Sequence, residues 1–331
     1  GGAQNFQALL SQSYDPGLYE VIIVDDGSTD GTLAKARSHL DVADPTRVSP
    51  ALKVLSTSDA GAESGSKKAA LTLGIAAATG DIILSTDADC QIPVDWVTTM
   101  AAHFTPDVDA VVGFSHIVEA GLVAGVEALD FLLLMTAARG ACGNGHPVAA
   151  SGQSFGFRRR AFEEVGGYEQ VRHRISGDDV LLLQLLRRAG KRIVFAYTPQ
   201  AAVVHPAATS VGALLRQRIR WASNGPIQVR LDPALFLQLT ATLLTSLGLV
   251  VAGGLAIAGR LDPLLAVGIW GIKALADAMM TLRGVQIFKR WDLLLFWPLW
   301  SLIHPLYLVV AGGLGCLGIF QWKGTNVRFG R

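Results

Sequence analysis

The feature that most constrains this chain is an uncharged apolar stretch, residues 234–258. As an α-helix rising 1.5 Å per residue, it is long enough to cross a hydrocarbon core of about 30 Å. Hydrophobic residues make up 50% of the chain and charged residues only 17%, whereas ordinary soluble domains are about 25% charged. The sequence therefore predicts a membrane protein.

A second apolar stretch, residues 264–283, contains Lys273 and Asp277. Charged groups inside a membrane must be paired, and a spacing of four residues places these two on one face of a helix. We therefore predict a second membrane span that carries an internal ion pair.

A third apolar stretch, residues 293–320, contains Pro298 and Pro305. We expect both prolines to kink the helix, because proline lacks the N–H that an interior turn requires. The predicted membrane region covers residues 233–321, with spans at 234–258, 264–283 and 293–320, and a polar tail follows at 322–331.

Residues 122–139 are also apolar, but Glu127 and Asp130 interrupt them. Acidic groups are costly in a bilayer, so this segment is predicted to be a core or interfacial helix rather than a span. Between the second and third spans the chain carries basic residues, which the positive-inside rule places in the cytoplasm. The same count places the basic tail on the opposite side, which the rule disfavours.

Up to residue 208 the sequence alternates β-type runs with helical segments. This alternation is typical of an α/β domain with a mainly parallel sheet. Helices are predicted from Ser66 to Ala78 and from Asp178 to Arg188, and an interfacial helix within 209–232. The predicted strands are the runs EVIIV, LKVLS, DIILST, DAVVGFS, QSFGF and RIVFAY.

The charge balance and the cysteines exclude several classes of function. The net charge is +1 and basic residues do not alternate with aromatic ones, so no nucleic-acid partner is expected. Cys90, Cys142 and Cys316 lie far apart without paired spacing. They indicate neither a disulfide framework nor a thiolate metal site.

Acidic pairs follow two of the predicted strands. Asp25 and Asp26 come after VIIV, and Asp87 and Asp89 come after DIILST. Ligands of open α/β sheets bind at the carboxyl ends of the strands, so the two pairs point to one crevice. The alternative for DDGSTDGT is ordinary turn and cap chemistry.

The run TDADC carries the more specific signal of the two. Its two carboxylates are hard oxygen ligands that suit Mg²⁺ or Mn²⁺, although a loop cap is the alternative. Lys67 stands at a predicted helix start, where backbone N–H groups already favour phosphate. Lys68, its neighbour, is expected at the surface.

Two further polar motifs lie downstream. Asp178 and Asp179 open a helix, either as functional acids or as residues that favour its N-terminus. In RQRIRW, Gln217, Arg220 and Trp221 lie within about one helical turn and share a face. Arg218 is expected to be a flanking positive charge at the membrane edge.

The order of these motifs resembles that of the family 2 inverting glycosyltransferases of the membrane-bound type, such as cellulose, chitin and hyaluronan synthases and ceramide glucosyltransferases. The resemblance covers almost the whole chain and implies a Rossmann-like GT-A fold followed by membrane helices. In this family a further strand precedes the first strand found here. That first strand is therefore expected to be missing from this chain, which starts at GGAQNFQALLSQSY.

The resemblance also implies how the donor is bound. Asp25 and Asp26 would hold the nucleoside of a nucleotide sugar, with Lys67 near the diphosphate. Asp87 would lie by the ribose and diphosphate, and Asp89 would ligate Mg²⁺ or Mn²⁺.

Asp179 corresponds to the general base of the family, and Asp178 would lie beside it on the acceptor side. Gln217, Arg220 and Trp221 match the Gln-x-x-Arg-Trp motif, which helps to hold the donor diphosphate and the acceptor end. Ser151, Gly152 and Gln153 stand where the synthases often have an acceptor-side motif.

The implied function is transfer of a sugar, with inversion, from a nucleoside diphosphate donor such as a UDP-sugar to a lipid or polysaccharide hydroxyl. The implied location is a bacterial inner membrane with the catalytic domain in the cytoplasm. The run WKG at 322–324 resembles one found after the last span of many bacterial relatives. Two alternatives stay open at this point: a metal-dependent nucleotidyltransferase, and a non-catalytic membrane subunit with an incomplete donor pocket.

Overall fold

A computed structural model describes residues 2–38, 49–61, 66–118, 120–322 and 325–327. Contacts between Cα atoms divide the chain into two compact units. The first comprises residues 1–116 and 138–206, and the second comprises 117–137 and 207–331. The long helix α5 (Leu122–Gly143) contributes to both units.

The first unit contains all six strands that the sequence predicts. β1 (Glu20–Asp25) pairs in parallel with β2 (Ala51–Ser56). A four-stranded sheet has the order β3-β6-β4-β7, and a small parallel pair joins β5 (Ser115–His116) to β8 (Val203–Val204). The bounds of the four-stranded sheet are β3 Ile82–Ser85, β4 Ala110–Gly113, β6 Phe155–Arg158 and β7 Ile193–Ala196.

The four-stranded sheet is mixed, whereas the sequence pattern predicted mainly parallel strands. β6 runs antiparallel to both of its neighbours, β3 and β4, while β4 and β7 are parallel. The direction of a strand depends on where its connections lead, and the alternation of apolar residues carries no information about that. The α/β class is confirmed.

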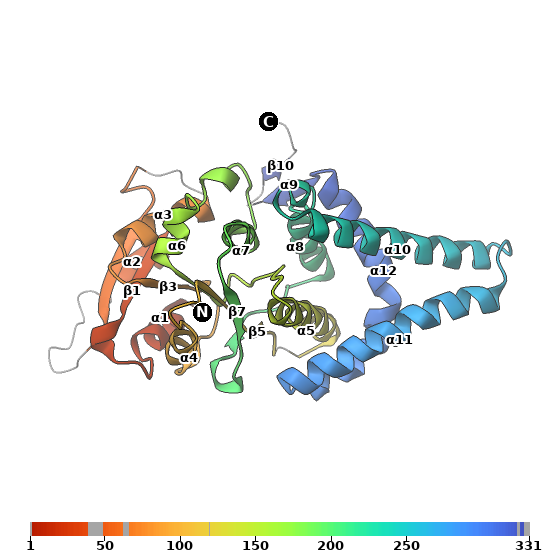
Figure 1. Cartoon of the computed structure of the whole chain (residues 1–331), viewed down its shortest axis with the longest axis horizontal. Coiled ribbons are helices and arrows are strands. Elements are labelled where there is room, and N and C mark those ends of the chain that lie inside the picture. The colour runs from red at the N-terminus through yellow and green to blue at the C-terminus, as the bar shows by residue number, and fades with distance from the viewer. Residues whose placement is uncertain (1, 39–48, 62–65, 119, 323–324, 328–331) are drawn as a thin grey trace. The chain divides into compact units, whose positions relative to one another are not determined.

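Helices surround these strands in the first unit (Figure 1). Ser66 caps α3 by accepting a hydrogen bond from the Ala69 N–H, and α7 begins at Asp178 after Gly177, whose φ of 78° is left-handed. Both helices were predicted with these ends. The helices of this unit other than α5 are α1 (Gly2–Leu10), α2 (Thr32–Ser38), α3 (Lys67–Ala77), α4 (Trp96–Ala102), α6 (Arg159–Glu164) and α7 (Asp178–Arg188).

Burial fixes the orientation of α7 and α4. Every residue of α7 from Leu181 to Leu186 is buried, so its acidic start is held by a wholly buried body. Trp96 and Met100 of α4 lie in a core cluster with Val111 of β4, and the Trp96 indole N–H donates to Ser154 Oγ at 2.9 Å. The end of the sheet near Ser154 is therefore rigidly packed.

The second unit contains three helices long and apolar enough to cross a membrane. They are α10 (Pro233–Ile257), α11 (Pro263–Phe288) and α12 (Trp297–Cys316), and a 3₁₀ segment at Trp291–Phe296 precedes α12. α10 and α11 are joined by a short turn and form a hairpin (Figure 1). The remaining elements are α8 (Val211–Ala222), α9 (Gln228–Leu231), β9 (Phe320–Trp322) and β10 (Thr325–Val327).

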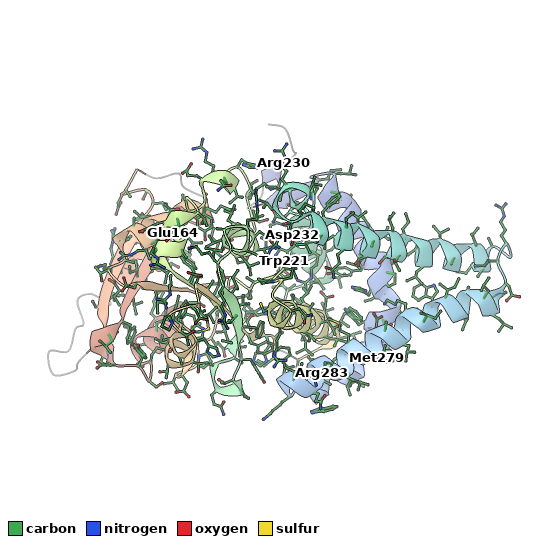
Figure 2. The ribbon with its side chains drawn as sticks, viewed as in Figure 1. Glu164, Trp221, Arg230, Asp232, Met279 and Arg283 are labelled. Carbon is green, nitrogen blue, oxygen red and sulfur yellow. The ribbon has the colours of Figure 1, made fainter. Side chains whose placement is uncertain are left out.

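The apolar helices contain one ion pair and two prolines, all of which the sequence singled out. Lys273 Nζ lies 2.5 Å from Asp277 Oδ2, which confirms the predicted ion pair. Pro298 lies in the first turn of α12, where its missing N–H is not needed, so only Pro305 lies inside the helix and the expected kink at Pro298 is wrong. On α11, Arg283 lies one turn beyond Met279 (Figure 2).

Arg218 is not a flanking charge at a membrane edge, as the sequence suggested. It is 5% exposed and its Nη2 lies 2.7 Å from Asp130 Oδ2 of α5. Asp130 also accepts hydrogen bonds from the Trp300 indole N–H at 3.0 Å and the Tyr307 hydroxyl at 3.3 Å. A buried guanidinium needs such a partner, and no local pattern reveals a carboxylate so far away in sequence.

The same network explains the acidic residues of α5. Glu127 is 1% exposed and accepts a hydrogen bond from the Ala208 N–H at 2.7 Å. Because Glu127 and Asp130 are both engaged with residues of the second unit, this part of α5 is a buried core helix, as predicted.

Replacing Asp130 with Ala is expected to destabilise the protein by about 3–5 kcal/mol, because it leaves the Arg218 guanidinium buried without its carboxylate. The measurement is unfolding in detergent, followed by tryptophan fluorescence. Glu169→Ala is the control, since its pair with Arg172 is more than 70% exposed on both sides, and it should leave unfolding unchanged. Equal unfolding of the two variants would contradict this account of α5 and α8.

Candidate active site

The end of β1 is built as a tight turn. The Asp25 carboxylate is buried and accepts hydrogen bonds from the backbone N–H groups of Gly27 at 3.2 Å and Ser28 at 3.3 Å. Gly27 has a φ of 79°, a conformation that favours glycine. Asp25 thus shapes the loop, and Asp26 follows it at the strand end, where the Thr57 hydroxyl donates to Asp26 Oδ1 at 3.5 Å.

The turn after β3 gathers three possible metal-ligand atoms. Those of Asp87, Asp89 and Cys90 lie within 4.8 Å of one another. Burial raises the pKa of the Cys90 thiol to about 12, and sulfur is a soft ligand that suits Mg²⁺ or Mn²⁺ less well than carboxylate oxygen. The Asp89 carboxylate is exposed and Asp87 half-buried, and burial and the charge of Asp87 raise the pKa of Asp89. Two close carboxylates of this kind fit a hard divalent cation.

Lys67 connects this turn to the start of α7. From the first turn of α3, its Nζ lies 2.6 Å from Asp87 Oδ1 and 3.1 Å from Asp178 Oδ2. Burial disfavours the charge of the ammonium, but the carboxylates of Asp178 and Asp87 outweigh this effect and raise the pKa of Lys67 above its ordinary value. A fixed positive charge therefore lies among the acids.

The Asp179 carboxylate is held by two backbone N–H groups. Oδ2 accepts from Gly152 N at 2.7 Å, and Oδ1 accepts from Val180 N at 2.7 Å. Burial and the neighbouring Asp178 carboxylate raise the pKa of Asp179 to about 6. At neutral pH this group is ionised and still basic enough to take a proton, which suits a general base.

Gly152 lies where these groups converge. A Cβ at this position would lie 3.3 Å from Lys67 Nζ, 3.5 Å from Asp179 Oδ2 and 3.6 Å from Asp178 Oδ2. A side chain at this position would therefore press on the Lys67 ammonium and lie in van der Waals contact with both carboxylates. One glycine in the loop before β6 thus lies beside Lys67 of α3 and the two acids that begin α7. Asp87, which follows β3, joins this group through its ion pair with Lys67.

Ser151 and Gln153, on either side of Gly152, are held by a serine that the sequence did not single out. Ser115 Oγ lies 2.8 Å from Ser151 Oγ and 3.0 Å from Gln153 Oε1, and the Ser151 hydroxyl is also hydrogen-bonded to Gln153 Oε1. Ser115 is fully buried. A lone serine within a predicted strand carries no signal in the sequence that could have identified it.

Lys68 is also not where the sequence placed it. It is 4% exposed rather than at the surface, and its Nζ donates to the backbone carbonyls of Arg174 at 2.7 Å and Ser176 at 3.1 Å. Consecutive residues of a helix point in directions about 100° apart, so Lys67 and Lys68 necessarily have different surroundings. A doubled lysine by itself gave no reason to bury the second one.

Gln217, Arg220 and Trp221 lie on α8 of the second unit. Gln217 Oε1 accepts a hydrogen bond from Arg218 Nη1 at 3.2 Å, and the Arg218 guanidinium lies 4.2 Å from the centroid of the Trp221 ring. Phe131 of α5 packs near the same indole, with ring centroids 6.4 Å apart, and Figure 2 shows Trp221 on α8. Arg218 therefore fixes two of the three side chains of the motif.

Two solved structures are distantly similar in fold. S. aureus TarS 1-349 has 16% sequence identity and a TM-score of 0.44, over 71% of this chain and 66% of that one. GalNAc-T7 with UDP, GalNAc and Mn²⁺ has 15% identity and a TM-score of 0.45, over 68% of this chain and 48% of that one.

Sequence comparisons are more informative. A Synechocystis beta-monoglucosyldiacylglycerol synthase is 32% identical over 232 residues, which cover 66% of this chain and 44% of that protein. This chain thus spans less than half of that relative. Glycosyltransferase AglE of Haloferax volcanii is 30% identical over 232 residues, which cover 69% of this chain and 70% of AglE.

Residues 3–166 match the family described as Glycosyl transferase family 2. The resemblance predicted from the motifs is thereby confirmed, and the chain is a glycosyltransferase that belongs to family 2.

Proposed function

We propose that this protein is a membrane-bound inverting glycosyltransferase that transfers a sugar from a UDP-sugar to the hydroxyl of a membrane lipid. The observation that carries the proposal is the position of the Asp179 carboxylate, which accepts a hydrogen bond from Gly152 N. Beside it lies Lys67, whose ammonium forms ion pairs with Asp87 and Asp178. A single positioned base next to a cationic site suits displacement of a diphosphate by an alcohol.

In this proposal the nucleoside lies at Asp25 and Asp26, and the ribose and diphosphate lie near Asp87 and Lys67. Asp89, beside Asp87, would hold Mg²⁺ or Mn²⁺, which would supply positive charge against the departing diphosphate. Because Lys67 adds a second cation there, the leaving group needs no proton. Gln217, Arg220 and Trp221 are assigned to the donor diphosphate and the acceptor end.

Asp179 acts on the acceptor. Its carboxylate takes the proton of the acceptor hydroxyl while that oxygen forms a bond to the anomeric carbon. The bond from this carbon to the diphosphate breaks on the opposite face, so an α-linked donor gives a β-glycoside. Asp178 and the loop of Ser151, Gly152 and Gln153 would form the acceptor side of the site.

The lipid acceptor is supported by two observations. The described part of the chain has three helices long and apolar enough to span a bilayer, and one relative is named as a beta-monoglucosyldiacylglycerol synthase. Lys289 and Arg290 follow α11, and we assign this turn and the catalytic unit to the cytoplasmic side of a bacterial inner membrane, where basic loops are favoured.

Asp179→Asn is expected to lower kcat by about 10²–10⁴-fold, because an amide cannot accept the acceptor proton. Release of nucleoside diphosphate by the full chain in lipid nanodiscs, with Mn²⁺ and a series of nucleotide sugars, measures the rate. Asp81→Asn is the matched control, since its side chain is 95% exposed at the start of β3, and it should retain activity. Wild-type turnover by Asp179→Asn would refute the assignment of the base.

The pH profile should show the titration of Asp179. Its pKa is raised to about 6, so the carboxylate is protonated and inactive below this pH and ionised above it. At saturating metal and donor, kcat should rise about tenfold between pH 5 and pH 7 and then level off. Unfolding temperatures measured at both pH values control for loss of structure. A flat profile over this range would contradict the proposed base.

Gly152→Ala is expected to lower kcat about 10- to 100-fold, since the added methyl group would displace the Lys67 ammonium by a few tenths of an ångström and contact both acids. Gly140→Ala is the control, because a Cβ there meets nothing within 4 Å. Turnover and unfolding temperature are measured for both variants. If Gly152→Ala matched Gly140→Ala in turnover, the acids and Lys67 would not need to converge at this loop.

A further inference from the structure

Two consecutive lysines in the first turn of α3 bind two different parts of the same neighbour. Lys67 forms an ion pair with Asp178, the first residue of α7. Lys68 donates to the carbonyls of Arg174 and Ser176, in the segment directly before α7. The start of α7 is therefore attached to α3 at its side chain and at its backbone.

The Lys68 contact is unusual in its burial. The side chain is 4% exposed, and it stands at a helix N-terminus, where the helix dipole disfavours positive charge. Burial lowers the pKa of Lys68 to about 8. A buried amine in this place is costly unless its N–H groups are used, and here they satisfy two carbonyls.

The attached segment leads into the proposed base with little slack. Ser176, itself buried, is followed by Gly177 in the left-handed conformation and then by the two acids. Asp179 must reach Gly152 N at 2.7 Å from the first turn of α7. A shift of the Arg174–Ser176 segment would therefore move the Asp179 carboxylate directly.

We infer that Lys68 is a positioning residue for glycosyl transfer: by holding the carbonyls of Arg174 and Ser176, it keeps the Asp179 carboxylate on Gly152. The inference rests on the proposed role of Asp179 as the base. It assigns Lys68 no contact with substrate. Displacement of a catalytic group by about 1 Å can lower the rate by about 100-fold, so the loss should be in kcat rather than in donor affinity.

Lys68→Met keeps an unbranched apolar side chain that reaches as far as Cε of the lysine and removes its donors. Lys53→Met is the matched control, because Lys53 Nζ donates to the carbonyl of Ala77 at 2.9 Å at the other end of the same helix. The full chain in nanodiscs is used throughout. Four quantities are measured: hydrogen exchange of residues 172–180, kcat and donor KM from nucleoside diphosphate release, and the unfolding temperature.

For Lys68→Met we expect faster exchange in residues 172–180 and a kcat lowered by about 10- to 100-fold, with donor KM within twofold of wild type. Lys53→Met should leave exchange in residues 172–180, kcat and donor KM unchanged, although it can lower the unfolding temperature. A Lys68→Met variant with wild-type exchange in this segment, or with no greater loss of kcat than Lys53→Met, overturns the inference.

Lys68→Gln covers the case in which the methionine variant does not fold. Its amide keeps N–H donors on a side chain one bond shorter, so exchange and kcat should lie between those of wild type and the full loss. Wild-type values for both would again overturn the inference. If the wild-type protein released no nucleoside diphosphate, the proposed function would fail, while the exchange data would still decide whether Lys68 holds the segment.

Discussion

The candidate site depends on the pairing of Lys67 with two carboxylates from different parts of the fold. Asp87 follows β3 and Asp178 begins α7, and each acid would repel the other without a cation between them. The ammonium allows them to come close, and Gly152 leaves room for this because it has no side chain. The strand end, the helix start and the loop are thus held in one arrangement by a single charge.

In the second unit, too, one charged side chain holds several partners together, but there the central charge is negative. There a carboxylate, Asp130 of α5, is the centre, and Arg218, Trp300 and Tyr307 are its partners. Arg218 in turn contacts Gln217 and Trp221, two residues of the Gln-x-x-Arg-Trp motif. The orientation of the motif therefore depends on a residue in a helix that precedes α8 by more than 60 positions.

Local sequence was sufficient to predict β1 to β4, β6 and β7, the ends of α3 and α7, and the Lys273–Asp277 pair, because these depend on neighbours within a few residues. It failed for the direction of β6, for the burial of Lys68 and Arg218, and for Ser115. For the two buried cations the deciding partner is distant in sequence: Arg174 and Ser176 for Lys68, and Asp130 for Arg218. A charged residue was assumed to face solvent because its partner could not be seen.

The two adjacent acids that begin α7 have different surroundings. Asp178 and Asp179 are consecutive, yet only Asp178 contacts the Lys67 ammonium, while Asp179 is held by uncharged N–H groups. Burial and a neighbouring carboxylate both disfavour the charged form of a carboxyl group and raise its pKa. This is the direction found, since the pKa of Asp179 is raised. Burial is the larger cause and the neighbouring Asp178 carboxylate the second, so the surroundings of Asp179 make it basic enough to accept a proton near neutral pH.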